Sequence, residues 1–339
     1  MAYTTIDNPE LYFQTKLYSG NDTDDHAITL DGDENMSPNL VWIKSRALTH
    51  NHQIHDTVRG VTKHISSDVA NAEATEATGL KSFDSDGFTL GTWDSVNVAS
   101  SGTYVAWCWK ESATAGFDMV AYTGTGSIHT QAHSLSAVPH IIIFKNREAT
   151  DWWTIYNHKL SAPADRAIFL NTTYVEFDED SGGETLWNDT VPTSSVFTVG
   201  DAEGVNTNTE DVIAYLWTAK QGYSRFGKYI GRASNFPFIY TGFKPAMVII
   251  KGALSGDGDA AQNWELYDNK RNPGNGMTLT LFPNTSGAES DQVRVDFLSN
   301  GFKIRQNSDG VNDNDSTYIY MAFAEAPFVN SNGVPCNAR

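Results

Sequence analysis

Four histidines lie close together in the first third of the chain, at His50, His52, His55 and His64. Imidazoles at this spacing on a strand and its turn are one way to hold a metal ion. Later parts of the chain repeat the surrounding pattern with Trp or Tyr at two of these places. Because positions that accept either histidine or a large aromatic ring are typical of packing, we predict no metal and no cofactor here.

Acidic clusters at Asp31–Asn35, Asp313–Asp315 and Glu176–Asp180 also bear oxygen groups that could do chemistry. The first two lack the full ligand spacing of a calcium loop and are predicted to be solvated turns. Glycoside cleavage needs two carboxyl groups about 5 to 10 Å apart, but the third cluster runs into Gly182-Gly183 and reads as an exposed loop. No nucleophile elbow, phosphate-binding loop or His-Glu-x-x-His element occurs. We therefore predict that the protein is not an enzyme.

Tryptophans are the next candidates, since sugar rings and protein partners both pack on exposed indoles. The chain has 9 Trp and 14 Tyr. Those within apolar runs are expected in the core, which leaves Trp93, Trp152 and Trp187 without a matching Trp elsewhere in the repeated pattern. We interpret these three as ligand or interface residues, with a subunit interface preferred over a sugar site.

Two Asp-x-x-Arg pairs, Asp56/Arg59 and Asp268/Arg271, occupy corresponding places, where the middle of the chain has Asn157 and Leu160. A carboxylate and a guanidinium three residues apart can bridge a turn through two hydrogen bonds. A structural role is therefore predicted for both pairs.

These residues stand in a pattern that the chain uses three times. It consists of an aromatic-x-glycine opener, a proline six residues before a lysine with a β-rich run between, and a Val-Asn pair before a closing strand. The openers are Tyr18/Gly20, Tyr122/Gly124 and Tyr229/Gly231. The central runs are Pro38–Lys44, Pro139–Lys145 and Pro245–Lys251, and the later pairs are Val96-Asn97, Val205-Asn206 and Val311-Asn312. The same alignment matches His52 with Trp153 and Trp264, His55 with Tyr156 and Tyr267, and Ala106-Trp107 with Ala214-Tyr215 and Ala322-Phe323.

Composition limits the class of protein. There are 41 acidic against 23 basic residues, a net charge of −18, and no Lys/Arg cluster of the kind that binds phosphate backbones. No apolar run approaches the roughly 20 residues of a membrane-spanning helix. Two cysteines, Cys108 and Cys336, cannot form a disulfide framework, and Cys108 is expected to be a buried, unreactive thiol. We predict neither nucleic-acid binding nor membrane insertion.

Short β-branched and aromatic runs separated by Asp-Gly and Gly-Gly turns predict an all-β fold. A period of about 100 residues is the size of a small domain, so we expect three tandem antiparallel β-sandwich repeats, jelly-roll or concanavalin-like in type. The best helix candidate is Ser67–Leu80, with a loop as the alternative. The predicted divisions are an N-terminal arm (1–14), repeats at 15–113, 114–223 and 224–328, and a C-terminal tail (329–339).

Several strings also resemble a family of repeat proteins encoded by tailed bacteriophages, frequent in phages of marine bacteria. The resemblance covers roughly residues 10 to 330 and rests on Tyr12–Gly20, Leu40–Lys44, Asp56–Gly60, Phe83–Phe88, Tyr104–Lys110 and Ala322–Phe328. It implies a virion structural protein with lectin-like sandwich folds, often assigned to tail fibres or adsorption. The family supplies no catalytic residues to transfer to this sequence.

Together these observations predict a non-enzymatic virion structural protein, a tail-fibre or adsorption-appendage subunit that contributes to assembly and host attachment. Its expected partners are other copies of itself, in a homo-oligomer such as a trimer, and other virion proteins. It would be assembled in the bacterial host cytoplasm. Two alternatives stay open: a lectin-like module that binds a host surface glycan, and a capsid-decorating protein.

Overall fold

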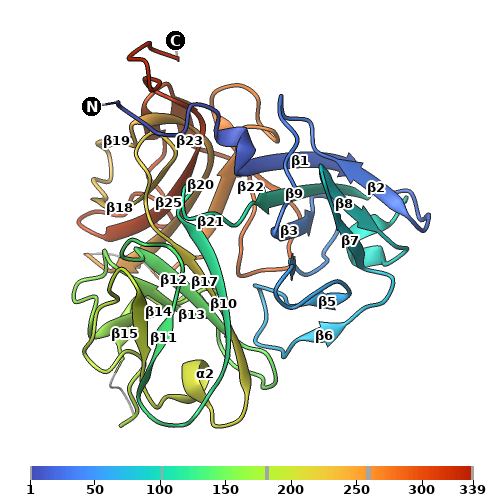
Figure 1. Cartoon of the computed structure of the whole chain (residues 1–339). Coiled ribbons are helices and arrows are strands. Elements are labelled where there is room, and N and C mark those ends of the chain that lie inside the picture. Colours follow the sequence, from blue (N-terminus) through green and yellow to red (C-terminus); the bar gives the residue numbers. More distant parts are fainter. Residues whose placement is uncertain (1, 101, 180–182, 257–260, 337–339) are drawn as a thin grey trace.

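The computed structural model describes residues 2–100, 102–179, 183–256 and 261–336. Nearly all regular structure in these ranges is antiparallel β-sheet (Figure 1). The helical pieces described are one 3-10 turn, η1 (Pro9–Leu11), and two single turns, α1 (Asp94–Asn97) and α2 (Glu203–Asn206). None of the described helices is long and apolar enough to cross a membrane. The predicted all-β class is confirmed.

Three main sheets carry the described part of the chain, and they share one strand order. The first main sheet, β1-β9-β3-β4, comprises Phe13–Ser19, Thr103–Trp109, Leu40–Ser45 and Gln53–Asp56. The second, β10-β17-β12-β13-β14-β15, comprises Phe117–Thr123, Asp211–Trp217, Ile141–Asn146, Thr154–Asn157, Arg166–Phe169 and Phe177–Asp178. The third, β18-β25-β20-β21, comprises Ser224–Ile230, Thr317–Pro327, Phe243–Leu254 and Glu265–Asp268. The chain parts that hold these sheets (13–109, 117–217 and 224–327) are called the first, second and third segments below.

Each segment adds smaller sheets. In the first segment these are β2-β8-β7 (His26–Thr29, Gly87–Leu90, Leu80–Asp84) and β5-β6 (Lys63–His64, Ala74–Thr75). The second segment adds β11-β16 (His129–Ala132, Val196–Val199). The third adds β19-β24-β23-β22 (Phe238–Tyr240, Gly301–Ile304, Ser290–Leu298, Met277–Thr280).

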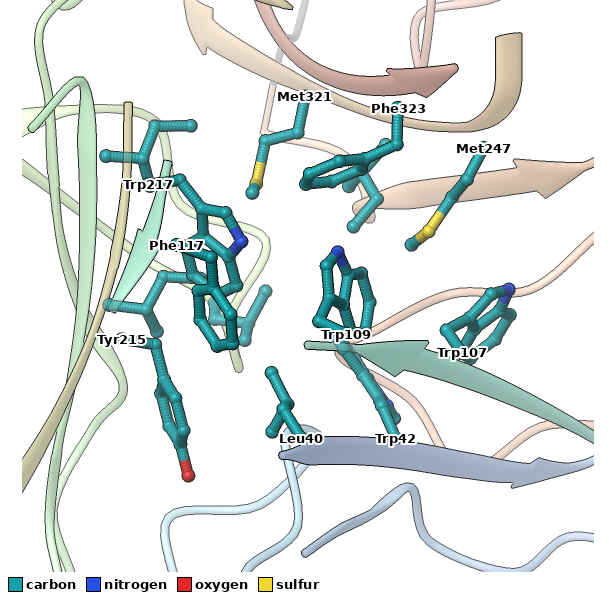
Figure 2. Close-up of a cluster of buried hydrophobic side chains, with 14 of the residues drawn as sticks. Leu40, Trp42, Trp107, Trp109, Phe117, Tyr215, Trp217, Met247, Met321 and Phe323 are labelled. Atoms are coloured by element: carbon teal, nitrogen blue, oxygen red, sulfur yellow. The ribbon is translucent and has the colours of Figure 1, made fainter. Parts of the chain in front are cut away.

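The core has four parts, because each main sheet buries both of its faces. One face packs against the smaller sheet of the same segment, which gives three local clusters. The opposite faces of all three main sheets meet in one central cluster (Figure 2). In β9, Tyr104 belongs to the local cluster of the first segment and Trp107 to the central cluster, as expected for side chains that alternate along a strand. The prediction that this strand is apolar and buried on both faces is confirmed.

Strand pairing corrects one detail of the sequence alignment. Trp42 pairs with Trp107 and Ile249 pairs with Met321, so Met321, not Phe323, is the counterpart of Trp107 in the third main sheet. Phe323 instead corresponds to Trp109. A shift of two residues leaves every side chain on the same face of a strand, so the burial pattern of the sequence could not reveal it.

The segment proposed as a helix, Ser67–Leu80, contains no helix in the structure. It is an irregular connection that includes the short strand β6 and lies against neighbouring segments. Its backbone is held by Lys145, which donates to Ala70 O (3.0 Å), and by Arg147 O, which accepts from Glu73 N (2.8 Å). The connection has few apolar positions, so these contacts, which no local pattern encodes, determine its path.

The first and last described residues of the chain lie near the third segment (Figure 1). Tyr3 Oη donates to Gly242 O (2.8 Å), and Thr4 Oγ1 donates to Gln221 O (2.7 Å). The Asp7 carboxylate accepts from the Ser331 backbone N–H (2.6 Å). The beginning of the chain therefore extends from the first segment onto the third.

Candidate functional site

Three ring N–H groups join the segments in a cycle. Trp153 Nε1 donates to Ser66 O, from the second segment to the first, over 2.9 Å. Trp264 Nε1 donates to Phe169 O, from the third segment to the second, also over 2.9 Å. His52 Nε2 lies 3.1 Å from Phe282 O and closes the cycle from the first segment to the third. The repeated position that holds His52, Trp153 or Trp264 therefore makes a contact between segments.

The repeated lysines are fully buried and donate to backbone carbonyls. Lys145 Nζ lies 2.9 Å from Asp151 O as well as 3.0 Å from Ala70 O of the first segment. Lys251 Nζ donates to Thr173 O of the second segment (2.9 Å). Burial lowers the pKa of Lys145 to about 8. Lys145 and Lys251 thus reach backbone oxygens of the neighbouring segment, whereas Lys44 Nζ donates to Ser45 O (2.8 Å) and Leu48 O (3.2 Å) of its own segment.

Two of the three junctions add a buried charge network. At the first-to-second junction, Glu73 accepts from Arg147 Nε (3.0 Å) and lies 3.4 Å from Arg59 Nη1. At the third-to-first junction, Glu289 is placed in the same way between Arg46 (2.7 Å) and Arg271 (3.4 Å).

The Asp-x-x-Arg pairs belong to these networks. Asp56 accepts from Arg59 Nε (2.5 Å) and from the Arg59 backbone N–H (2.8 Å), so the predicted turn bridge is present with one guanidinium and one backbone donor. Asp56 also accepts from Tyr215 Oη across the junction (2.7 Å). Asp268 repeats these contacts with Arg271, and accepts from Trp107 Nε1 (3.1 Å).

The second-to-third junction differs on both of its sides. Asn157 and Leu160 replace the charged pair, and Met321, the counterpart of Trp107 and Tyr215, has no donor to offer a carboxylate. Asn157 and Met321 line one small cavity of about 10 Å³. An unpaired buried carboxylate there would lack compensation, so the loss of the charge and the loss of the donor belong together.

Two rings of the histidine cluster make hydrogen bonds within the first segment. Trp42 Nε1 donates to His52 Nδ1 (2.9 Å), and His55 Nδ1 lies 2.9 Å from Lys63 O. Burial, followed by the Arg59 charge, lowers the pKa of His55 to about 3. Among the residues that the structure describes, no group of three or more His, Cys, Asp or Glu side chains could hold a metal ion.

Two of the acidic clusters contact basic side chains or backbone N–H groups. Asp31 lies 3.5 Å from both Lys16 and Lys270. In the Glu176–Asp180 stretch, Glu176 accepts from the Ser161 backbone N–H (3.0 Å), and Glu179 accepts from the Trp187 backbone N–H (2.6 Å). Asp180 lies outside the described residues. The two glutamates thus hold the loop that contains them.

Of the three candidate tryptophans, Trp187 lies in the core of the second segment. Its side chain is 2% exposed, its ring packs on Phe144 and Tyr156, and Nε1 donates to Arg166 O (3.1 Å). The smaller sheet here has two strands where the other segments have three and four, and the loop with Leu186 and Trp187 completes the local core. Trp187 is therefore unavailable to a surface ligand in this structure.

Trp152 lies on the surface, 43% exposed, beside Tyr174, which is 56% exposed. The two ring centroids are 6.0 Å apart, and Phe169 supports Trp152 from below at 4.4 Å. This pair forms an exposed aromatic patch on the second segment.

Trp93 lines a pocket of about 320 Å³ in the first segment, together with His50 and His64, so the structure brings one candidate tryptophan to two residues of the histidine cluster. The Trp93 and His64 ring centroids are 4.6 Å apart. Gly79 leaves room for the indole, because a Cβ there would lie 3.3 Å from Trp93 Cε3. We call this cavity the Trp93 pocket.

A larger groove of about 710 Å³ lies between the first and third segments. Within it, Lys244 Nζ and Asn269 Nδ2 each donate to the Glu325 carboxylate (2.8 Å). Sequence reasoning did not predict this groove, because residues from distant parts of the chain line it, among them Gln14, Lys244 and Glu325.

Comparison with protein families finds one match, described as a domain of unknown function (DUF7483), over residues 8–327. The chain belongs to this family. The match spans all three segments without a break, so the family unit is the whole three-segment body. A search of curated proteins finds no match.

One residue of the Trp93 pocket was not selected from the sequence, although a signal exists. Strand pairing makes His64 equivalent to Ala167 and Thr280, because the following residues form the bridges Ile54–Ile65, Ile155–Ile168 and Leu266–Leu281. His64 is thus the large side chain among these three equivalent residues. Trp93 is likewise the large side chain at its own repeated position. The sequence alignment treated His64 only as a neighbour of the other histidines.

Proposed function

We propose that this protein is a non-enzymatic structural subunit of a bacteriophage virion, placed in a tail fibre or adsorption appendage. Its three segments would be copies of one two-sheet β-sandwich, fused around a common centre into a rigid body. The sequence resemblance to phage repeat proteins motivates the location. The structural role depends on the use that the segments make of their recurring polar residues.

The observation that carries the structural role is the cycle of junction contacts. His52, Trp153 and Trp264 occupy equivalent places, and each reaches a backbone carbonyl of a neighbouring segment. Two of the repeated lysines, Lys145 and Lys251, and both Asp/Arg pairs also make contacts to a neighbouring segment. Residue types that often serve catalysis are therefore engaged in fixing one segment against the next, as expected for a scaffold.

Aromatic residues of all three segments meet at the centre of the molecule and also support a structural role. Trp109 lies 6.3 Å from Trp217 and 5.6 Å from Phe323, between ring centroids, and Figure 2 shows these side chains converging from three sheets. Burying such large side chains stabilises each by about 1.5 to 3 kcal/mol relative to exposure. A segment separated from the others would expose them, so the segments are expected to act as one body.

Exposed aromatic residues outside the junctions are the proposed assembly surface. Trp152 and Tyr174 form one patch, and Phe238 (46% exposed) and Tyr240 (47% exposed) project from β19, an edge strand. Aromatic residues are enriched in protein interfaces, and an edge strand offers unpaired backbone groups. A homo-oligomer, with other virion proteins attached, would use these surfaces.

The decisive experiment is mass spectrometry of purified phage particles, followed by imaging of the particle at residue resolution. The proposal predicts the protein in the particle at a fixed copy number, in a fibre or adsorption appendage. If the protein lies on the capsid, the proposed role changes from an appendage subunit to a capsid-decorating protein. Absence from purified particles would refute the virion role.

A second candidate function, glycan binding, is favoured by a specific observation, the pocket beside Trp93. Attachment to a host surface and recognition of a surface glycan are compatible tasks in one subunit. The pocket therefore carries its own proposal.

A further inference from the structure

We propose that the Trp93 pocket binds one neutral sugar unit of a surface glycan. This inference builds on the proposed role in host attachment. It names the ligand class that the first segment would recognise, and assigns a binding site to residues of that segment.

Size is the first support. The pocket volume of about 320 Å³ lies at the lower end of the range typical of small-molecule sites. That volume accommodates one or two sugar rings and is too small for a folded partner. All of its lining residues belong to the first segment: Thr49, His50, Asn51, Gln53, His64, Ile65, Ser66, Val69, Asn71, Ala72, Ala74, Trp93 and Ser95.

Charge is the second support. None of the described residues that line the pocket is Asp, Glu, Lys or Arg, although the chain has 41 acidic residues. Burial, with a further effect of Lys44, lowers the pKa of His50, and burial with Arg59 lowers that of His64. Both imidazoles are therefore neutral at pH 7, and no lining residue offers an opposite charge to a charged ligand.

Hydrogen-bonding capacity is the third support. The lining includes His50, Asn51, Gln53, Asn71 and Ser95, which offer both donors and acceptors. This combination matches sugar hydroxyls, since each hydroxyl can donate one hydrogen bond and accept others.

Trp93 supplies the apolar surface that a sugar ring needs. The C–H groups on one face of a pyranose pack on an indole, while the hydroxyls around its edge reach polar side chains. The indole is held by His64 (4.6 Å between centroids) and by the Trp93 backbone N–H, which donates to Thr78 O (2.9 Å). A ring fixed before binding loses little freedom when a ligand arrives.

The same two rings distinguish the first segment from the others. Where the first has Trp93, hydrogen bonds to the following Val-Asn pair identify Ala202 and Ser308 as the counterparts. Where it has His64, the strand bridges identify Ala167 and Thr280. Both large rings are thus replaced by small side chains in the other two segments, so this pair of contacting rings is particular to the Trp93 pocket.

Other ligands fit less well. A nucleic-acid base could stack on Trp93, but single-stranded nucleic acids also require positive charge along the phosphate backbone, which the pocket lacks. A protein side chain from a second copy would leave most of the neutral polar groups without partners. The neutral saccharide satisfies the stacking surface and the hydrogen-bonding groups together.

The test uses the intact chain on an array of bacterial surface glycans. Isothermal titration calorimetry with individual neutral sugars (glucose, galactose, mannose, N-acetylglucosamine) then measures affinity. Trp93→Ala and His64→Ala, which introduces the residue of the second segment, are expected to weaken binding at least about tenfold. Trp152→Ala serves as the matched tryptophan control and should bind as the original chain does. Unchanged thermal unfolding of each variant establishes that the fold is intact.

Three outcomes would overturn the proposal: no saturable binding of any neutral glycan, binding that survives both pocket substitutions, or binding lost only in the Trp152 variant. Should Trp93→Ala fail to fold, Asn71→Ala at the pocket rim and His64→Ala carry the test. Sugar binding by a protein that is absent from virions would preserve this inference and refute the proposed virion role. Presence in virions without sugar binding would refute this inference and preserve the proposed virion role.

Discussion

Replacing Arg59 by leucine tests the claim that buried charges hold the first segment against the second. In this variant Asp56 would keep the hydroxyl of Tyr215 (2.7 Å) and the backbone N–H of residue 59 (2.8 Å), but lose the guanidinium at 2.5 Å. Both side chains of the ion pair are fully buried. Removing one partner of a buried pair costs about 3 to 5 kcal/mol, because the remaining charge is uncompensated. We expect the free energy of unfolding to fall by that amount.

A triple variant supplies the matched comparison, because the chain already contains an uncharged version of this junction. Its substitutions are Asp56→Asn, Arg59→Leu and Tyr215→Met, which copy Asn157, Leu160 and Met321. With the carboxylate removed as well, no buried charge is left unpaired at Asp56. Exchanging a whole buried pair for uncharged residues is often close to neutral, so we expect the triple variant to regain at least about 2 kcal/mol relative to Arg59→Leu.

Urea unfolding followed by tryptophan fluorescence measures both effects, with refolding checked by dilution. Because the segments share one core, we expect a single unfolding transition. If more than one transition occurs, the urea midpoints of the variants are compared instead of free energies. A triple variant no more stable than Arg59→Leu would refute the reasoning. So would an Arg59→Leu variant within about 0.5 kcal/mol of the original chain.

Three further predictions concern buried groups. His55 has a folded-state pKa of about 3, below the unfolded value near 6.5, so its contribution to stability is complete above about pH 6.5 and is lost as the pH falls toward 3. His55→Tyr should therefore reduce the fall in urea midpoint between pH 7 and 4.5, and an unchanged fall would contradict this. Trp153→Phe should cost about 1 to 3 kcal/mol in the same assay, since Ser66 O loses its donor, whereas Trp152→Phe should change little. A thiol reagent should modify exposed Cys336 in the folded protein but Cys108 only after unfolding, because Cys108 is buried and burial raises its pKa; rapid modification of both would show that the first segment opens.

Local patterns were sufficient for part of this structure. Three confirmed features depend on residues near one another in sequence. They are the β-strand content, the two apolar faces of Tyr104–Trp109, and the turn made by Asp56 and Arg59. The shift between Phe323 and Met321 was not accessible, because a displacement of two residues preserves the face of every side chain. The path of Ser67–Leu80 was not accessible either, since residues of other segments hold it.

The candidate tryptophans show the same limit. Absence of a matching Trp predicted that Trp93, Trp152 and Trp187 would be surface residues, and this reasoning identified the exposed Trp152 and the pocket of Trp93. It could not separate them from Trp187, which fills the core where the smaller sheet of the second segment has fewer strands. Whether an unmatched aromatic residue is exposed depends on what covers it, and that is a property of the fold.

Differences between the segments divide into two kinds. A junction residue is constrained by its own segment and by the neighbour, so Asn157 in place of aspartate occurs together with Met321 in place of a donor. The pair formed by His64 and Trp93 needs only two rings of one segment to fit each other, and Gly79 provides the space for the indole. Such a pair can change without disturbing a junction. A scaffold of this design can therefore acquire a binding pocket in one segment while its three sheets keep a common core.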